Sequence, residues 1–197
     1  MLSVKDKIIK LANENNGIIT SKIVSEAGIS RGNLKYLSDR GFLQKTVRGV
    51  YVLPNSWDDE FINIQTRFKK GIFSNETALF LHDLTDRTPS KFIMTFPNSY
   101  NLHNVRKEKN ILTKQTKEEF YYLGITTVYS PTGNKVRAYN MEKTLCDLIK
   151  YGSDQDLISD SFRRYLRRKD KNIPKLSEFS KILKVEKQIK SYLEVLL

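Results

Sequence analysis

The side chains that could do chemistry lie close together near the start of the chain. Arginine can read guanine and asparagine can read adenine, each through two parallel hydrogen bonds to a base edge. Lysine and a further arginine in the same segment more naturally contact phosphates, which position a protein on DNA without reading sequence. The residues with this chemistry are Ser30, Arg31, Asn33, Lys35, Tyr36, Arg40, Lys45 and Arg48.

The elements that must position these residues follow from the surrounding sequence. Thr20 and Ser30 are N-cap types for two short helices, and Gly28 and Gly41 suit the positive φ that follows a helix end. Two short β-prone runs follow, broken at Arg48-Gly49. An amphipathic helix precedes all of these elements, with apolar residues at Val4, Ile8, Leu11 and Ala12. This order predicts a winged helix-turn-helix DNA-binding domain over residues 1–57, whose second helix enters the major groove.

Positive charge is clustered toward both ends of the sequence. The formal net charge is +12. Residues 1–57 carry nine Lys/Arg and four Asp/Glu, and residues 161–197 carry eleven and four. Residues 58–160 are neutral, with fourteen of each sign. A compositional bias would be uniform, so this clustering predicts two basic surfaces.

Residues 58–197 are predicted to form a larger α+β domain. Lys91–Phe96 has the composition of a strand, and Ile125–Tyr129 and Val136–Tyr139 flank a turn as in a β-hairpin. Asn140 is an N-cap type for a following helix, and from about Asp154 the sequence is helical, with interruptions near Pro174 and Lys184. The expected fold class is therefore α+β: an N-terminal winged helix, then a small sheet and a helical, basic C-terminal end.

One helix in this C-terminal end, predicted from Leu157 to Lys169, concentrates positive charge. Its apolar residues share one face, and its arginines lie almost opposite. Three interpretations stay open: a second contact with the same DNA, a surface for an acidic protein or structured RNA, or a solvated face. The residues of this basic C-terminal surface are Arg163, Arg164, Arg167, Arg168, Lys169 and Lys171.

Catalytic and metal-binding patterns are weak. His82 and His103 have no ligand partners at metal spacing, and there is no phosphate-binding glycine loop. The single cysteine, Cys146, favours a buried thiol rather than a nucleophile or a disulfide. We therefore expect no enzyme, no metal and no cofactor. The start of the chain is unlike a signal peptide and no apolar run is long enough to span a membrane, so we expect a cytoplasmic protein.

Several segments, taken in order, resemble AbiEi-type antitoxins. They are a wing ending in GVYVLP, then FSNETALFLHDLTDRTP, a KFIMTFP strand and a YNMEKTLCDLI helix. These antitoxins belong to type IV toxin–antitoxin systems of bacterial abortive infection, a phage defence. The resemblance implies autoregulation, with repression of its own operon at inverted repeats in the promoter, and antagonism of a nucleotidyltransferase toxin encoded beside it.

The resemblance also implies a separate role for each of the two domains. It assigns DNA reading to Arg31, Asn33, Lys35 and Tyr36 with Arg48 in the wing, and antitoxicity to the C-terminal domain. It does not imply stable contact with the toxin. Since no heptad pattern is sustained, we expect a monomer in solution that loads pairwise on an inverted repeat. Two other classes stay open: a winged-helix transcription factor that senses a ligand through residues 58–160, and a nucleic-acid-processing enzyme.

Overall fold

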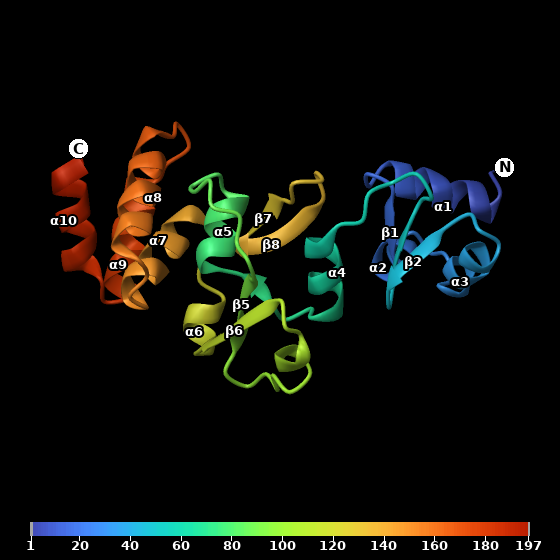
Figure 1. Ribbon diagram of the computed structural model, residues 1–197, viewed down its shortest axis with the longest axis horizontal. Helices are drawn as coiled ribbons and strands as arrows, with labels where there is room; N and C mark the ends of the chain where they lie inside the picture. The colour runs from blue at the N-terminus through green and yellow to red at the C-terminus, as the bar shows by residue number, and fades with distance from the viewer. Residues whose placement is uncertain (1, 197) are drawn as a thin grey trace. The chain divides into compact units, whose positions relative to one another are not determined.

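A computed structural model describes residues 2–196 and divides into two compact units. The first unit extends to Lys69 and also includes Tyr129–Val136. The second consists of Lys70–Val128 and the chain from Arg137 onward. Both units contain helices and short strands, and the chain ends in four consecutive helices, so the fold is α+β, as expected (Figure 1). In residues 2–196 we find no helix with the length and apolarity needed to cross a membrane.

The first unit packs three helices against a small antiparallel sheet whose strand order is β1-β3-β2. Its core contains Ile8, Val24, Leu34 and Leu43, each at most 1% exposed. In chain order the elements are α1 (Val4–Asn13), β1 (Ile18–Thr20), α2 (Ser21–Glu26), α3 (Gly32–Asp39), β2 (Gln44–Val47) and β3 (Val50–Val52) (Figure 1).

Local hydrogen bonds explain where these helices begin and end. The Thr20 side chain accepts from the backbone N–H of Ile23 and caps α2, as predicted. Gly28 and Gly41 have φ values of +70° and +77°, so both take the left-handed conformation expected after a helix. The expectation for Ser30 was wrong: Arg31 occupies the N-cap position of α3, without a side-chain capping bond.

The β2–β3 hairpin closes through a tight turn at Arg48-Gly49. Val47 pairs with Val50, and Gly49 has a φ of +85° that side chains with a Cβ rarely adopt. The register shifts between Lys45 and Val47, which is a β-bulge or similar irregularity. Bulges increase the local twist of a hairpin and re-aim its side chains.

A buried carboxylate completes the first unit. Asp59 is 2% exposed and caps α4 (Glu60–Arg67) by accepting from the backbone N–H of Ile62. Its Oδ2 also accepts from Ser130 Oγ at 2.6 Å, from Asn134 Nδ2 at 2.9 Å and from the Thr132 hydroxyl. The predicted domain boundary at residue 57 lies before α4, whereas the division into compact units lies after it.

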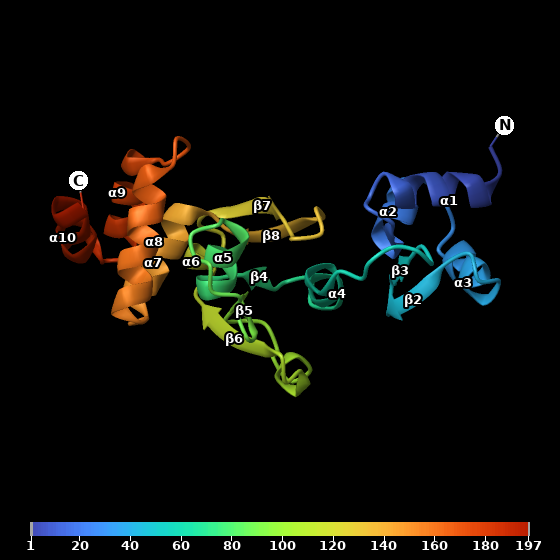
Figure 2. The same ribbon diagram turned by 45° about the horizontal axis from the view of Figure 1, so that its top comes forward.

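The larger sheet has the strand order β6-β5-β4-β8-β7, and most of its residues belong to the second unit (Figure 2). β5 and β6 run parallel over six residue pairs, and β4 pairs antiparallel with β5. The strands are β4 (Ile72–Phe73), β5 (Phe92–Pro97), β6 (Ile111–Thr116), β7 (Ile125–Tyr129) and β8 (Lys135–Tyr139). Shorter elements are helix α5 (Asn75–Leu81), the 3-10 helix η1 (Val105–Lys107) and helix α6 (Glu118–Tyr121).

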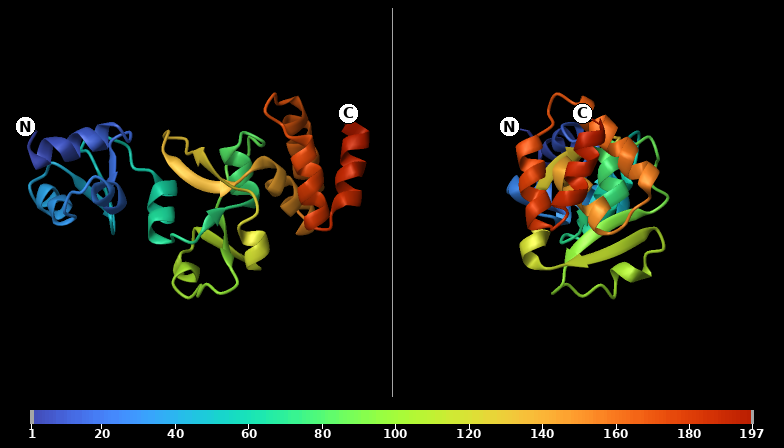
Figure 3. Two further views of the ribbon diagram at one scale, coloured as in Figure 1. Left: turned by 180° about the vertical axis from the view of Figure 1, so that it is seen from behind. Right: turned by 90° about the vertical axis from the view of Figure 1, so that its left-hand side faces the viewer.

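Four helices follow the sheet and share one apolar core. Its members include Leu145, Phe162, Leu176 and Ile189, each at most 1% exposed. Asn140 caps the first of these helices by accepting from the backbone N–H of Lys143, as predicted. The four are α7 (Met141–Lys150), α8 (Gln155–Arg167), α9 (Ile173–Ile182) and α10 (Glu186–Leu196) (Figure 3).

Helix α7 also buries an ion pair. Lys143 Nζ donates to both carboxylate oxygens of Asp147 at 2.6 Å, and the two side chains are only 3% and 4% exposed. Burial raises the pKa of Asp147, and the adjacent Lys143 ammonium opposes that rise. Each charge is tolerated in the core because the other neutralises it.

Candidate nucleic-acid interface

Helix α3 has one buried and one exposed face. Leu34 and Leu37 are buried in the core of the first unit, whereas Lys35 and Tyr36 are exposed. The Arg40 guanidinium lies over the Tyr36 ring, 4.4 Å from its centroid, and the Tyr36 side chain remains 51% exposed. The cation–π contact therefore holds an aromatic and a cationic group together on the surface.

Arg31 precedes this helix and is held by a side chain of α2. Arg31 Nε donates to Ser25 Oγ at 2.6 Å, and Ser25 Oγ itself donates to the Ser21 carbonyl at 2.8 Å. Because this contact uses only Nε, the Nη1 and Nη2 edge can still donate two parallel hydrogen bonds. An end-on fork of this kind fits guanine O6 and N7, or a phosphate.

Asn33 is half-buried and bonded to its own turn. Its Nδ2 donates to the Ser30 carbonyl at 3.0 Å, which leaves a second hydrogen on Nδ2 and the Oδ1 acceptor. Those two groups are the pair that adenine recognition requires. Ser30 thus contributes its carbonyl rather than its hydroxyl to the start of α3.

The β2–β3 hairpin carries the two remaining predicted residues of the first unit. Lys45 lies on β2 opposite Tyr51, and Arg48 is at the turn. Both side chains are exposed. All eight side chains predicted for DNA binding thus lie on α3, on the turn before it, just after its end or on this hairpin, and seven of them are exposed; Asn33 is intermediate.

The basic C-terminal surface is less uniform than its spacing predicts. Helix α8 ends at Arg167, and Arg168 already has an extended backbone. The Arg164 guanidinium bonds to the carboxylates of Asp160 and Asp86, and the Arg168 guanidinium bonds to Asp170.

The carboxylates paired with these two arginines have lowered pKa values. The hydrogen bond from Arg164 holds the pKa of Asp86 below its usual range, and Arg168 does the same for Asp170. The remaining predicted residues, Arg163, Arg167, Lys169 and Lys171, are exposed. Two of the six predicted cations, Arg164 and Arg168, therefore form ion pairs within the protein. Arg163 and Arg167 are exposed and lie one helical turn apart on α8.

Side chains with catalytic potential are used structurally. Cys146 is buried, and burial raises the pKa of its thiol to about 12, so the thiolate needed for attack is scarce. His82 Nε2 lies 2.7 Å from the Tyr139 carbonyl. Across the described part of the chain, no cluster of three or more His, Cys, Asp or Glu side chains could hold a metal ion.

Comparison with known proteins places the chain in no family. No protein-family model matches it, and no curated protein matches it. A solved structure described as "Crystal structure of RV2827C protein from Mycobacterium tuberculosis" is similar at a TM-score of 0.48 and 12% sequence identity. The match covers 98% of this chain and 82% of that one. At this score and identity the likeness supports no functional conclusion.

Proposed function

We propose that residues 1–57 are a winged helix-turn-helix domain that binds double-stranded DNA. The order of α1, α2, α3 and the β2–β3 hairpin supports this proposal, with α3 as the recognition helix and the hairpin as the wing. The observation that carries it is the anchored Arg31, whose free guanidinium edge lies at the start of a helix that also exposes Lys35 and Tyr36.

The contacts divide into two groups under this proposal. Arg31 and Asn33 read base edges, whereas Lys35, Lys45 and Arg48 contact phosphates. Tyr36 and Arg40 form a cation–π pair, and both side chains are exposed. The excess of positive charge in residues 1–57 supports the same assignment, because it attracts the phosphate backbone.

We further propose that the protein is an antitoxin and autorepressor of the type IV kind. Two copies occupy an inverted repeat in its own promoter, and residues 58–197 counteract a nucleotidyltransferase toxin. The support is the ordered resemblance of the wing, the FSNETALFLHDL segment and the YNMEKTLCDLI helix to AbiEi-type antitoxins. A protein with this role acts in the cytoplasm, where its operator lies.

DNA binding is tested with a fragment of the upstream region of the gene, by fluorescence anisotropy at several salt concentrations. We expect Arg31→Ala to weaken binding and relax base preference, and Lys190→Ala, at an exposed lysine of α10, to serve as the control. Antitoxicity is tested by co-expression with the neighbouring nucleotidyltransferase. Growth rescue supports the proposal, and a neighbouring gene of another class contradicts the antitoxin assignment.

A further inference from the structure

The outer strand of the small sheet is anchored by a helix that lies beyond residue 57. β2 is an edge strand, since the strand order is β1-β3-β2, and its register with β3 shifts at Thr46. The Thr46 hydroxyl donates to Asn63 Oδ1 of α4 at 2.9 Å, and the Val50 carbonyl is a more distant acceptor at 3.5 Å. Asn63 is 7% exposed, and its Nδ2 donates to both carboxylate oxygens of Asp58 at 2.9 and 2.8 Å. Helix α4 therefore holds β2 at the point where its pairing is irregular.

The turn of the β2–β3 hairpin also lies close to α4. A Cβ at Gly49 would lie 3.9 Å from Thr66 Cγ2 on that helix. Lys45 and Arg48, the proposed phosphate contacts, lie on either side of Thr46 in the chain. Because a register shift of this kind re-aims the side chains around it, the direction of these two cations depends on α4.

Helix α4 is itself held by a segment from far along the chain. Its N-cap, Asp59, accepts hydrogen bonds from three side chains of the turn between β7 and β8, which are Ser130, Thr132 and Asn134. The Gly133 carbonyl of the same turn accepts from Asn16 Nδ2 at 3.0 Å. Residues 129–136 belong to the first unit, whereas the rest of β7 and β8 belongs to the second. Hydrogen bonds inside the first unit thus connect this turn to α4, and α4 to the β2–β3 hairpin.

We propose that the turn at residues 130–134 positions the β2–β3 hairpin for DNA, acting through Asp59 and Asn63. Both are positioning residues: they hold Thr46, and Thr46 sets the direction of the two cations beside it. DNA affinity then depends on a segment outside the predicted winged helix that is continuous with strands of the second unit. The effect on DNA rests on the proposed function, whereas the effect on the hairpin can be measured without DNA.

Substitutions in the full chain test the DNA contact, with a duplex from the upstream region of the gene. Thr46→Val removes the hydroxyl while keeping the size of the side chain, Thr46→Ser keeps the hydroxyl, and Asn134→Ala removes one donor to Asp59. We expect Thr46→Val and Asn134→Ala to weaken binding by about two- to fivefold, since each removes one hydrogen bond. Thr46→Ser should bind like the unchanged chain. The matched control is Thr127→Val, at an exposed threonine of β7 in the second unit, which should have no effect.

The salt dependence of binding separates positioning from a general loss of structure. Thr46→Val changes no charge, yet the slope of log K against log salt should become shallower by about 0.9 for each phosphate contact that is lost. Arg48→Ala should also cost less affinity in the Thr46→Val background than in the unchanged chain. An unchanged slope, or an equal cost of Arg48→Ala in both backgrounds, overturns the inference.

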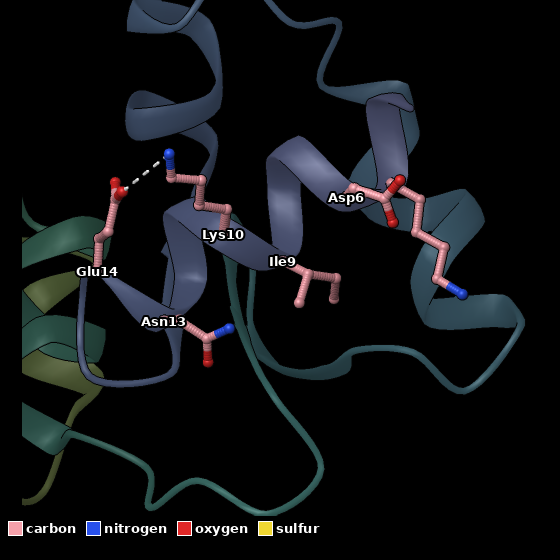
Figure 4. A pocket seen from close by; sticks show the side chains of 6 residues that line it. Asp6, Ile9, Lys10, Asn13 and Glu14 are labelled. Atoms are coloured by element: carbon pink, nitrogen blue, oxygen red, sulfur yellow. Dashed lines mark ion pairs between the residues drawn. The ribbon is translucent and has the colours of Figure 1, made fainter. Parts of the chain in front are cut away.

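A charge control comes from the outer face of α1. Lys10 Nζ lies 3.9 Å from a carboxylate oxygen of Glu14 there, beside a shallow pocket (Figure 4). Lys10→Ala removes one positive charge of the first unit that is not part of the hydrogen-bond network. We expect this variant to keep both the slope and the full cost of Arg48→Ala.

NMR spectra recorded without DNA test the positioning independently of the proposed function. Asn134→Ala should shift the amide signals of Arg48 and Gly49, whereas Thr127→Val should leave them in place. Far-UV circular dichroism shows whether each variant folds, and Thr132→Val, which removes a different donor to Asp59, replaces Asn134→Ala if that chain does not fold. Unmoved signals overturn the inference. An unchanged chain that fails to bind DNA overturns the proposed function instead, and shifted signals would still support the positioning of the hairpin.

Discussion

Arg31 Nε donates to Ser25 Oγ at 2.6 Å, which joins the residue before α3 to an exposed serine of α2. The hydroxyl of Ser25 is in turn fixed by the Ser21 carbonyl. An arginine held in this way loses less side-chain entropy when it binds than a freely rotating one. Ser25 is thus placed to position Arg31 without contacting DNA itself.

The first prediction concerns this pair. Arg31→Ala should cost about 1–3 kcal/mol of binding to the preferred operator and relax preference at one base pair. Ser25→Ala should cost less, about 0.5–1.5 kcal/mol, since it removes one hydrogen bond that orients the guanidinium. Anisotropy titrations against base-substituted operators measure both effects. The two losses should not add in the double variant, and full additivity would contradict a positioning role for Ser25.

The second prediction separates the arginines of α8. Arg163 and Arg167 are exposed, whereas Arg164 and Arg168 are tied to carboxylates. If this surface contacts DNA, changing Arg163 and Arg167 to Ala should reduce the slope of log K against log salt by about 1.8, which corresponds to two phosphates. Changing Arg164 and Arg168 to Ala should alter that slope less. An unchanged slope in the first variant would mean that the surface has a different partner.

The third prediction concerns the buried ion pair of α7. Lys143→Met should lower the free energy of unfolding by about 3–5 kcal/mol, because it leaves the Asp147 carboxylate buried without its partner. Adding Asp147→Leu should recover much of this loss, since no buried charge then remains. Urea denaturation followed by circular dichroism provides the measurement. The matched control is Lys190→Met, at an exposed lysine that also lies four residues from its carboxylate partner.

The fourth prediction follows from burial of His82, which lowers its pKa below the ordinary value of 6.5. As the pH falls below 6.5, His82 therefore binds a proton in the unfolded chain before it does so in the folded chain. Stability should be full above pH 6.5 and fall as the pH drops toward the lower folded pKa. Thermal unfolding from pH 8 to 5 measures this.

Two variants at the histidines isolate the effect. His82→Gln keeps a donor for the Tyr139 carbonyl but does not titrate, so it should flatten the pH dependence. His103→Gln, at the exposed histidine, is the control. A steep dependence that survives His82→Gln would assign the proton to another group.

Strong local patterns made part of this fold predictable. The apolar spacing in α1, the Thr20 cap and the turn at Gly49 indicated the correct elements, as did the turn between β7 and β8. Strands β1 and β4 have only three and two residues, too few to show a period of two. Helix α4 was not predicted from the sequence, although Asp59, directly before it, is a preferred N-cap type.

The basic surface shows what spacing alone cannot reveal. Helical periodicity placed Arg164 on the same face as Arg163, but its partner Asp86 is 78 residues away in sequence. Whether a cation is neutralised depends on tertiary contacts of that kind. The winged helix-turn-helix assignment and the domain boundary at residue 57 stay predictions.

The anchoring of Asp59 has a consequence for synthesis of the chain. Its partners Ser130 and Asn134 lie 71 and 75 residues downstream. During translation, helices α1–α3 can form early, but the Asp59 carboxylate meets its hydroxyl and amide donors only after residue 134 has left the ribosome. A protein truncated before that point would retain the proposed DNA-reading residues. Its Asp59 carboxylate would lack these donors and would be hydrated by water instead. Nascent chains of increasing length can be compared by limited proteolysis. We expect the start of α4 to become protease-resistant in one step, only once residue 134 has emerged.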